Sequence, residues 1–205
     1  MAEHPPEPRQ EDGPPHPPPA MDVEQAMAAT PRRAFLPDDQ RDVAHLDQPL
    51  PIGYGQTNSQ PTTVRNMLHA LDVRPGQHVL DVGAGSGWTT AILGRLVGPD
   101  GCVLGLELQP ELAAWGRDNL MAAGLPWTRL DPAEPGLLGR PQEAPYDRIL
   151  VSAEARELPE VLVEQLAEGG TMVLPVAGRL LRVHRPAGGP ASVERLGRYR
   201  FVPLR

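Results

Sequence analysis

Three alternating glycines and a carboxylate at the end of the next strand are the residues in this chain best suited to hold a small ligand. Gly83, Gly85 and Gly87 follow an apolar stretch at 79–82. Glycine allows a tight turn and a close approach of the backbone to a ligand, where a Cβ atom would collide. Glu107 ends the next apolar stretch, where a carboxylate can accept both hydroxyls of a ribose. Together these residues predict a site for a nucleoside-containing cofactor.

The spacing of the glycines favours S-adenosylmethionine over a dinucleotide. The run from Asp81 to Gly87 reads D-x-G-x-G-x-G, whereas a dinucleotide site typically has G-x-G-x-x-G with the third glycine inside the helix. Asp81 is expected near the methionine ammonium group, and a cap on the backbone N–H groups of the turn is the alternative. The six histidines are scattered and Cys102 is the only cysteine, so no metal site is expected.

Apolar periodicity predicts alternating strands and helices that would position these residues. A short helix is expected to begin at Met21 and end at Pro31, followed by an exposed connection over 32–37. The polar, glycine- and proline-rich residues 49–61 are expected to form a loop. Helices are expected at 61–71, 87–97, 110–122 and 159–167. Strands are expected at 78–82, 102–107, 126–130, 147–152 and 171–176, and an antiparallel pair at 179–183 and 193–202.

This order predicts an α/β fold: a doubly wound, mostly parallel, Rossmann-like sheet with helices on both faces and a terminal antiparallel strand pair. Such sheets bind ligands beyond the carboxyl ends of their strands, where the winding direction changes. Residues 1–20 hold eight of the 26 prolines and are expected to be a disordered tail. Residues 21–205 are expected to form one domain, with a helical lobe and loop at 21–71 and the core at 72–205.

Charge and composition exclude several classes of partner. The formal net charge is −7 and no basic patch is evident, which argues against nucleic acid. No apolar run is long enough to cross a bilayer, and the first residues do not read as a secretory signal. A cytoplasmic, monomeric protein is therefore expected.

From about Pro31 onwards, the chain resembles the protein-L-isoaspartate O-methyltransferase family. The most specific part is PIGYGQTNSQP at 51–61, which matches the family signature P-I-G-x-G-Q-T-x-S-x-P at every defined position. Further similarity lies at 144–151, 166–170 and 200–204. The resemblance implies that Ser59 is the catalytic residue beside the substrate carboxylate. It also implies that Thr57, Asn58 and Gln60 shape the contact between substrate and cofactor.

The resemblance adds Leu108 and Asp131 to the cofactor site. In the family, an aspartate flanked by glycines contacts the adenine amino group, but Leu130 and Pro132 flank Asp131 in this chain. A helix or turn cap is the alternative role for Asp131. Glu154 stands where relatives have a small residue; a solvated loop acid is expected, and a narrower acceptor range is the alternative.

The resemblance implies transfer of a methyl group from S-adenosylmethionine to the α-carboxylate of L-isoaspartyl residues in damaged proteins or peptides. An isoaspartyl α-carboxylate is ionised at neutral pH, so its attack needs no general base. Methylation makes a good leaving group, and succinimide formation then leads to repair. Two alternatives stay open. One is a carboxyl methyltransferase dedicated to an aspartate of one modified peptide, and the other is a homologue that binds cofactor or peptide without turnover.

Overall fold

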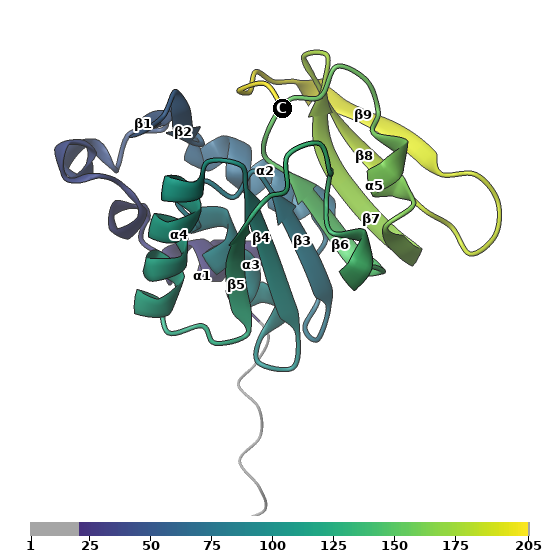
Figure 1. The fold of residues 1–205 in the computed structure, drawn as a ribbon, viewed down its shortest axis with the longest axis horizontal. Coiled ribbons are helices and arrows are strands. Elements are labelled where there is room, and N and C mark those ends of the chain that lie inside the picture. The colour runs from purple at the N-terminus through teal and green to yellow at the C-terminus, as the bar shows by residue number, and fades with distance from the viewer. Residues whose placement is uncertain (1–20, 205) are drawn as a thin grey trace, which may run out of the picture.

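A seven-stranded sheet forms the centre of the molecule, and the computed structural model describes residues 21–204 (Figure 1). The strands of this sheet are β3 (His78–Val82), β4 (Cys102–Glu107), β5 (Thr128–Pro132), β6 (Tyr146–Val151), β7 (Leu166–Val176), β8 (Arg179–His184) and β9 (Ser192–Arg198). The helices are α1 (Val23–Ala28), α2 (Pro61–Leu71), α3 (Trp88–Val97), α4 (Pro110–Ala122) and α5 (Glu160–Val163). Short 3-10 helices occupy η1 (Arg32–Phe35), η2 (Asp38–Val43) and η3 (Pro141–Glu143).

The strand order is β5-β4-β3-β6-β7-β8-β9. Strands β3 to β7 run parallel, and β8 and β9 are added antiparallel at one edge. The winding direction changes at β3, which pairs with β4 on one side and β6 on the other. The expected doubly wound α/β fold with a terminal antiparallel pair is confirmed. Its ligand-binding edge is therefore the carboxyl end of β3 and β4.

Alternating residues of the parallel strands face two apolar layers. Val79 packs with residues of α1, α2, α3 and α4 on one face, whereas Leu80 packs with α5 on the other. Helix α2 buries the stripe Val64, Met67, Leu68 and Leu71, as its periodicity predicts. The N-terminal helices thus share a core with the sheet, and the second face is covered by little helix.

The expectation of a loop over 49–61 is wrong for most of its length, because this segment forms a β-hairpin. Strand β1 (Leu50–Gly53) pairs antiparallel with β2 (Gln56–Asn58). Tyr54 and Gly55 connect them with φ angles of 54° and 71°, as a two-residue hairpin turn requires. Leu50 and Ile52 are buried in a small apolar cluster apart from the main core. Burial of Leu50 and Ile52 stabilises this hairpin, although the composition of the segment is typical of a loop.

The expected helix at 159–167 is also too long. Helix α5 covers only Glu160–Val163, and β7 already begins at Leu166, which pairs with Tyr146 of β6. The register then shifts before Thr171 pairs with Arg148. Gly169, with φ of 77°, lies inside this irregularity of β7. The glycines at 169–170 therefore accommodate a bulge in the strand and do not end a helix.

Two smaller differences concern strand boundaries. Strand β5 extends to Pro132, so Asp131 lies within a strand. Strand β9 ends at Arg198, earlier than expected. None of the helices within residues 21–204 is both long and apolar enough to cross a membrane. The expected disordered tail, residues 1–20, lies outside the described residues.

Candidate functional site

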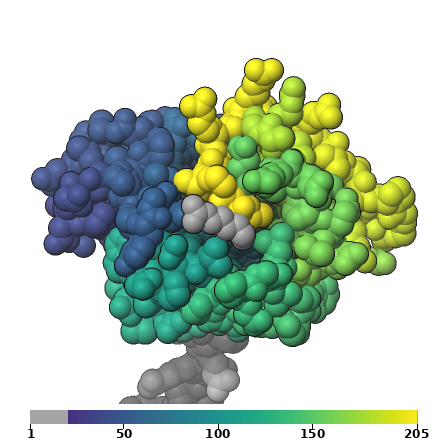
Figure 2. Space-filling model, turned by 45° about the horizontal axis from the view of Figure 1, so that its top comes forward, coloured from purple at the N-terminus to yellow at the C-terminus, as the bar shows by residue number. Residues whose placement is uncertain are grey.

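A cavity of about 630 Å³ opens at the carboxyl ends of β3 and β4. Its walls come from the glycine turn after β3, the residues after β4 and β5, the β1–β2 hairpin, and residues 202–204 near the C-terminus. In Figure 2 the blue N-terminal, teal central and yellow C-terminal parts of the chain meet on this face. The volume and the position at the switch in winding direction suit a small-molecule site.

The glycine turn forms one wall of the cavity. Gly83, Gly85 and Gly87 have φ angles of 80°, 55° and 84°. Residues other than glycine rarely adopt such positive φ angles. Gly83 and Gly85 line the cavity, whereas Gly87 caps α3 outside it. The turn packs on α4 at Gly116, where an added Cβ would lie 2.9 Å from the Gly85 carbonyl oxygen. Gly116 therefore fixes the position of the turn, although in the sequence it looks like an ordinary helical glycine.

Glu107 is held in the cavity wall by two backbone N–H groups. It is only 6 % exposed, its Oε2 accepts from Gly85 N at 2.9 Å, and its Oε1 accepts from Gln109 N at 2.9 Å. Each carboxylate oxygen can accept a further hydrogen bond. Glu107 and Leu108 both line the cavity, so the expected cofactor residues at the end of β4 lie together. This arrangement fits a ribose with two adjacent hydroxyls.

Asp81 lies beneath the glycine turn and does not line the cavity. Its side chain is fully buried, Oδ2 accepts from Thr90 Oγ1 at 2.7 Å, and Oδ1 has no hydrogen-bond partner among the described residues. The alternative role as a cap of the turn is wrong, because no backbone N–H of the turn donates to this carboxylate. Burial raises the pKa of Asp81 to about 7, although the hydrogen bond from Thr90 opposes this shift.

The raised pKa of Asp81 predicts a loss of stability as pH rises. The folded protein keeps the Asp81 proton up to about pH 7, whereas the unfolded chain loses it near the ordinary pKa of 3.8. The stability that this protonated carboxyl group contributes is therefore fully present below pH 3.8 and is lost as pH rises through about 7. Asparagine cannot ionise, so Asp81→Asn should be more stable than wild type at high pH. Its gain in the free energy of unfolding over wild type should be about 2–4 kcal/mol larger at pH 8 than at pH 5. Urea denaturation at both pH values measures this, with Asp100→Asn on an exposed loop as the control. Parallel pH profiles for wild type and Asp81→Asn would contradict it.

The β1–β2 hairpin presents the expected acceptor residues to the same cavity. Thr57, Asn58 and Ser59 line it. The Ser59 hydroxyl makes no hydrogen bond with residues 21–204, so it is available to a ligand. Asn58 Nδ2 donates to Ser86 Oγ at 3.3 Å and links the hairpin to the glycine turn. Gln60 lies outside the cavity, where its Nε2 donates to Asp47 at 3.1 Å.

Arg32 is buried, which makes the expectation of an exposed connection at 32–37 wrong at this residue. It is 6 % exposed, and its guanidinium donates to Asn58 Oδ1 at 2.7 Å and to the carbonyl oxygens of Asn58 and Ser59, each at 3.0 Å. Further bonds reach the carbonyl oxygens of Leu46 and Gln48 at 3.0 and 2.8 Å. Burial lowers the pKa of Arg32 to about 10, which leaves it charged at neutral pH. Arg32 thus holds the backbone at both ends of residues 50–59, the β1–β2 hairpin with Ser59, which we call the acceptor loop.

Trp88 joins Arg32 to the core and also lines the cavity. The Trp88 side chain is buried, its Nε1 donates to the Thr30 carbonyl oxygen at 2.9 Å, and the Arg32 guanidinium carbon lies 5.6 Å from its ring centroid. Asp47 fixes the chain just after the acceptor loop, because it accepts from Thr62 N and Thr62 Oγ1, both at 2.8 Å. These bonds cap the start of α2 and hold the pKa of Asp47 below its ordinary value.

Asp131 lies outside the cavity and takes part in an ion-pair network on β5. Its Oδ2 lies 3.3 Å from Arg129 and 3.9 Å from Arg140. Arg129 also pairs with Glu143. The acid of the following loop that does line the cavity is Glu134, together with Leu137 and Leu138. No local pattern in the sequence marks these loop residues as part of the site.

Glu154 anchors a short bridge to the C-terminal segment of the cavity wall. Its backbone N–H donates to Val202 O at 2.7 Å, and its carbonyl oxygen accepts from Leu204 N at 2.8 Å. Val202, Pro203 and Leu204 line the cavity, whereas Glu154 itself does not. The structure therefore places Glu154 behind the wall through its backbone. Residues 202–204 and the hairpin thus line the same cavity, although they lie far apart in the sequence.

Comparisons with known proteins identify relatives of this chain. A family profile described as "Protein-L-isoaspartate(D-aspartate) O-methyltransferase (PCMT)" matches residues 20–205. A protein-L-isoaspartate O-methyltransferase of Methanopyrus kandleri is 47 % identical over 186 residues, covering 89 % of this chain and 82 % of the relative. One of Aeropyrum pernix is 50 % identical over 186 residues, covering 89 % of this chain and 72 % of the relative.

A solved structure has a similar fold. It is a Plasmodium falciparum protein described as a protein-L-isoaspartate O-methyltransferase, in complex with S-adenosyl-L-homocysteine. The TM-score is 0.78 at 25 % identity, and the match covers 89 % of each chain.

Proposed function

This chain belongs to the protein-L-isoaspartate O-methyltransferase family, and on that premise we propose that isoaspartyl residues of damaged proteins are methylated in the cavity at the carboxyl ends of β3 and β4. The observation that supports this proposal is that the cofactor wall and the acceptor loop face the same space. Gly83, Gly85 and Glu107 line it from the sheet, and Ser59 lines it from the hairpin. Residues 21–205 are proposed to act as one methyltransferase domain.

The cofactor half fits S-adenosylmethionine because of its donor and acceptor groups. A carboxylate held by Gly85 N and Gln109 N is oriented to accept from a ribose diol. Leu108 and Leu137 line the cavity nearby and can contact an adenine ring. When bound, the cofactor supplies an electrophilic methyl group on a sulfonium ion. Asp81 and Gly87 support this half from behind the wall and do not contact the ligand directly.

Glu134 is proposed to accept the hydrogen bond of the adenine amino group. It lines the cavity, whereas Asp131 is engaged by Arg129 and Arg140 outside it. Asp131 would then act indirectly, by holding the strand from which the Glu134 loop departs. This assignment replaces a direct contact by Asp131 with one from the acid three residues later.

The acceptor half orients an anion without neutralising it. The Ser59 hydroxyl can donate to one oxygen of an isoaspartyl carboxylate, and Thr57 and Asn58 shape the wall beside it. The carboxylate is already ionised, so the chain has no proton to remove. Alignment of the attacking oxygen accounts for the rate, since orientation effects contribute roughly 7–11 kcal/mol in favourable cases. Gln60 acts through Asp47 and Thr62 by fixing the end of the loop.

Replacing Ser59 with Ala tests this assignment. A lost hydrogen bond to a charged group costs about 1.5–3 kcal/mol, so kcat/KM for an isoaspartyl peptide should fall about 10-fold to 150-fold. The affinity for S-adenosylhomocysteine, measured by calorimetry, should change far less. The matched control is Ser192→Ala, at an exposed position on β9. Equal rates for wild type and Ser59→Ala would reject the role of Ser59, and absence of methyl transfer by the wild type would reject the activity.

The cytoplasmic location, the monomeric state and the absence of nucleic acid and membrane partners stay predictions from the sequence. The same holds for the choice between general repair and one dedicated peptide. Comparing an isoaspartyl peptide with its aspartyl counterpart in the same assay decides that choice. General repair is expected to give methylation of the isoaspartyl form alone.

A further inference from the structure

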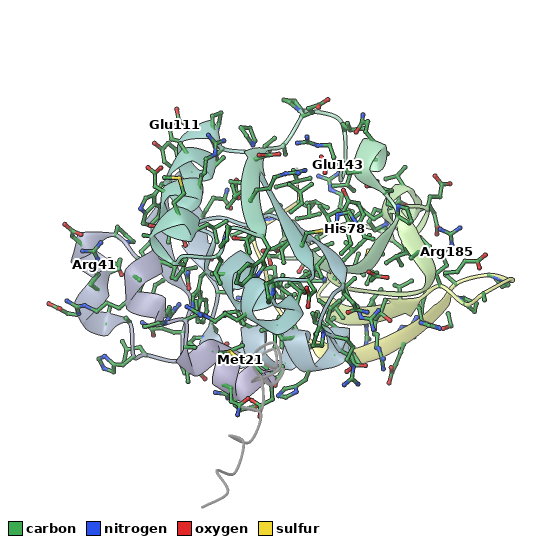
Figure 3. The ribbon with its side chains drawn as sticks, turned by 90° about the horizontal axis from the view of Figure 1, so that it is seen from below. Met21, Arg41, His78, Glu111, Glu143 and Arg185 are labelled. Atoms are coloured by element: carbon green, nitrogen blue, oxygen red, sulfur yellow. The ribbon has the colours of Figure 1, made fainter. Side chains whose placement is uncertain are left out.

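The C-terminal hairpin of β8 and β9 carries a concentration of positive charge that the chemistry of the cavity does not use. Residues 179–200 contain six arginines and one acid, Glu194, for a net charge of +5. Residues 21–178 contain 21 acidic and 11 basic residues, for a net charge of −10. The expectation that no basic patch exists is therefore wrong. In Figure 3, Arg185 beside this hairpin lies on the side of the molecule opposite Arg41 of the N-terminal lobe.

Three arginines share one face of the hairpin. Arg179 pairs directly with Arg198 across the strands, and Leu181, two residues further along β8, pairs with Arg195. All three arginines are exposed. The ion pair within the hairpin joins Arg182 to Glu194 at 3.9 Å, and these three have no carboxylate partner within residues 21–204. Like charges directly opposite each other destabilise a strand pair, so this face is arranged at a cost to folding.

The arginine face is joined to the cavity wall by a short stretch of chain. Strand β9 is the edge of the sheet and ends at Arg198, and the wall begins at Val202. Four residues span at most about 14 Å, so Arg198 and its strand partner Arg179 lie near the cavity wall. The cavity lining is different in charge, because it holds four acids, Glu107, Glu134, Glu157 and Glu160, and one basic residue, Arg156.

We propose that the face formed by Arg179, Arg195 and Arg198 docks an acidic segment of the acceptor protein, a few residues away from the isoaspartate. This inference rests on the proposed methyltransferase function. A guanidinium matches a carboxylate with two parallel hydrogen bonds, so arginine suits such a partner. The excess of acids in the cavity lining disfavours carboxylates next to the isoaspartate and thus sets a minimum spacing. The net charge of −10 on residues 21–178 opposes a long polyphosphate, which favours an acidic protein over nucleic acid.

The test compares three synthetic acceptors. One is a short isoaspartyl peptide, the second adds a spacer of about four residues and about six glutamates, and the third has glutamines in place of those glutamates. Methylation is measured with wild type, with Arg195→Gln/Arg198→Gln, and with the control Arg65→Gln/Arg74→Gln. The control removes two exposed arginines from α2 and the loop after it, so the change in net charge is the same.

Wild type and the control are expected to methylate the glutamate peptide about fivefold to tenfold faster than the glutamine peptide at low salt, in kcat/KM. The Arg195→Gln/Arg198→Gln variant should lose this preference and methylate the short peptide as wild type does. About 0.5 M NaCl should remove the preference from all proteins.

Equal rates for the two extended peptides, or a preference that survives in Arg195→Gln/Arg198→Gln, would overturn the proposal. Two other results would also overturn it if wild type shows no preference for the glutamate peptide. One is binding of single-stranded DNA that is lost in Arg195→Gln/Arg198→Gln. The other is concentration-dependent dimerisation, measured by light scattering, that is lost in the same variant. Each of those results would assign the face to another occupant. Failure of wild type to methylate even the short peptide would instead reject the proposed function.

Discussion

Replacing Arg32 with Ala is expected to lower kcat/KM for an isoaspartyl peptide by about 100-fold or more, because it leaves several buried carbonyl oxygens unpaired at about 1–3 kcal/mol each. The guanidinium holds the backbone of Asn58 and Ser59 and the side chain of Asn58. Without it, the Ser59 hydroxyl is no longer fixed relative to the cofactor wall. The affinity for S-adenosylhomocysteine should fall much less, since Glu107 and the glycine turn do not contact Arg32.

Two further measurements separate positioning from a general loss of structure. Arg33→Ala is the matched control, because the adjacent arginine is largely exposed and pairs with Asp42 at 3.2 Å. Methylguanidinium added to Arg32→Ala should restore part of the rate by occupying the vacated space, whereas methylammonium, which lacks the planar fork, should not. If Arg32→Ala is as active as Arg33→Ala, or loses cofactor binding to the same extent as methyl transfer, Arg32 is not a positioning residue.

Replacing Glu107 with Gln is expected to weaken binding of S-adenosylhomocysteine by at least about 100-fold. Two hydrogen bonds from a ribose to a carboxylate contribute about 1.5–3 kcal/mol each, and an amide replaces one acceptor oxygen with a donor. This donor would also face Gly85 N or Gln109 N, both of which need an acceptor. Calorimetric titration measures the change.

The control for this experiment is Glu111→Gln, four residues later and exposed on the surface of α4. Its dissociation constant should equal that of wild type. A change of less than about threefold in Glu107→Gln would show that this carboxylate does not hold the ribose. Circular dichroism of both variants confirms that the fold is retained.

The strands and helices around the cofactor wall could be predicted because their apolar residues repeat regularly. The stripe on α2 and the short, nearly continuous apolar runs of β3 and β4 each identify one element. Glu107 falls at a strand end, where a carboxylate can bind a ribose. The α/β fold follows from the order of such elements. The β1–β2 hairpin could not be predicted in this way, because glycine and proline dominate its composition and only Leu50 and Ile52 anchor it.

Residues that act through distant contacts were missed for a different reason. Arg32 lies 26 residues before Asn58, and nothing in a short charged segment indicates that one of two adjacent arginines is buried. Gly116 matters because of its contact with Gly85, 31 residues earlier, which no local pattern reveals. The expectation for Asp131 follows from the family pattern, and only the packing of the loop after β5 reveals that Glu134, and not Asp131, lines the cavity. Such assignments depend on packing between elements.

The unpaired hydroxyl of Ser59 also bears on product release. A hydrogen-bond donor aimed at a carboxylate binds an anion better than a neutral acyl group. Methylation turns the carboxylate into an ester and removes its charge, so the loop holds the product less firmly than the substrate. Accumulated methyl ester should therefore be a weak inhibitor, and turnover continues while damaged chains are still present.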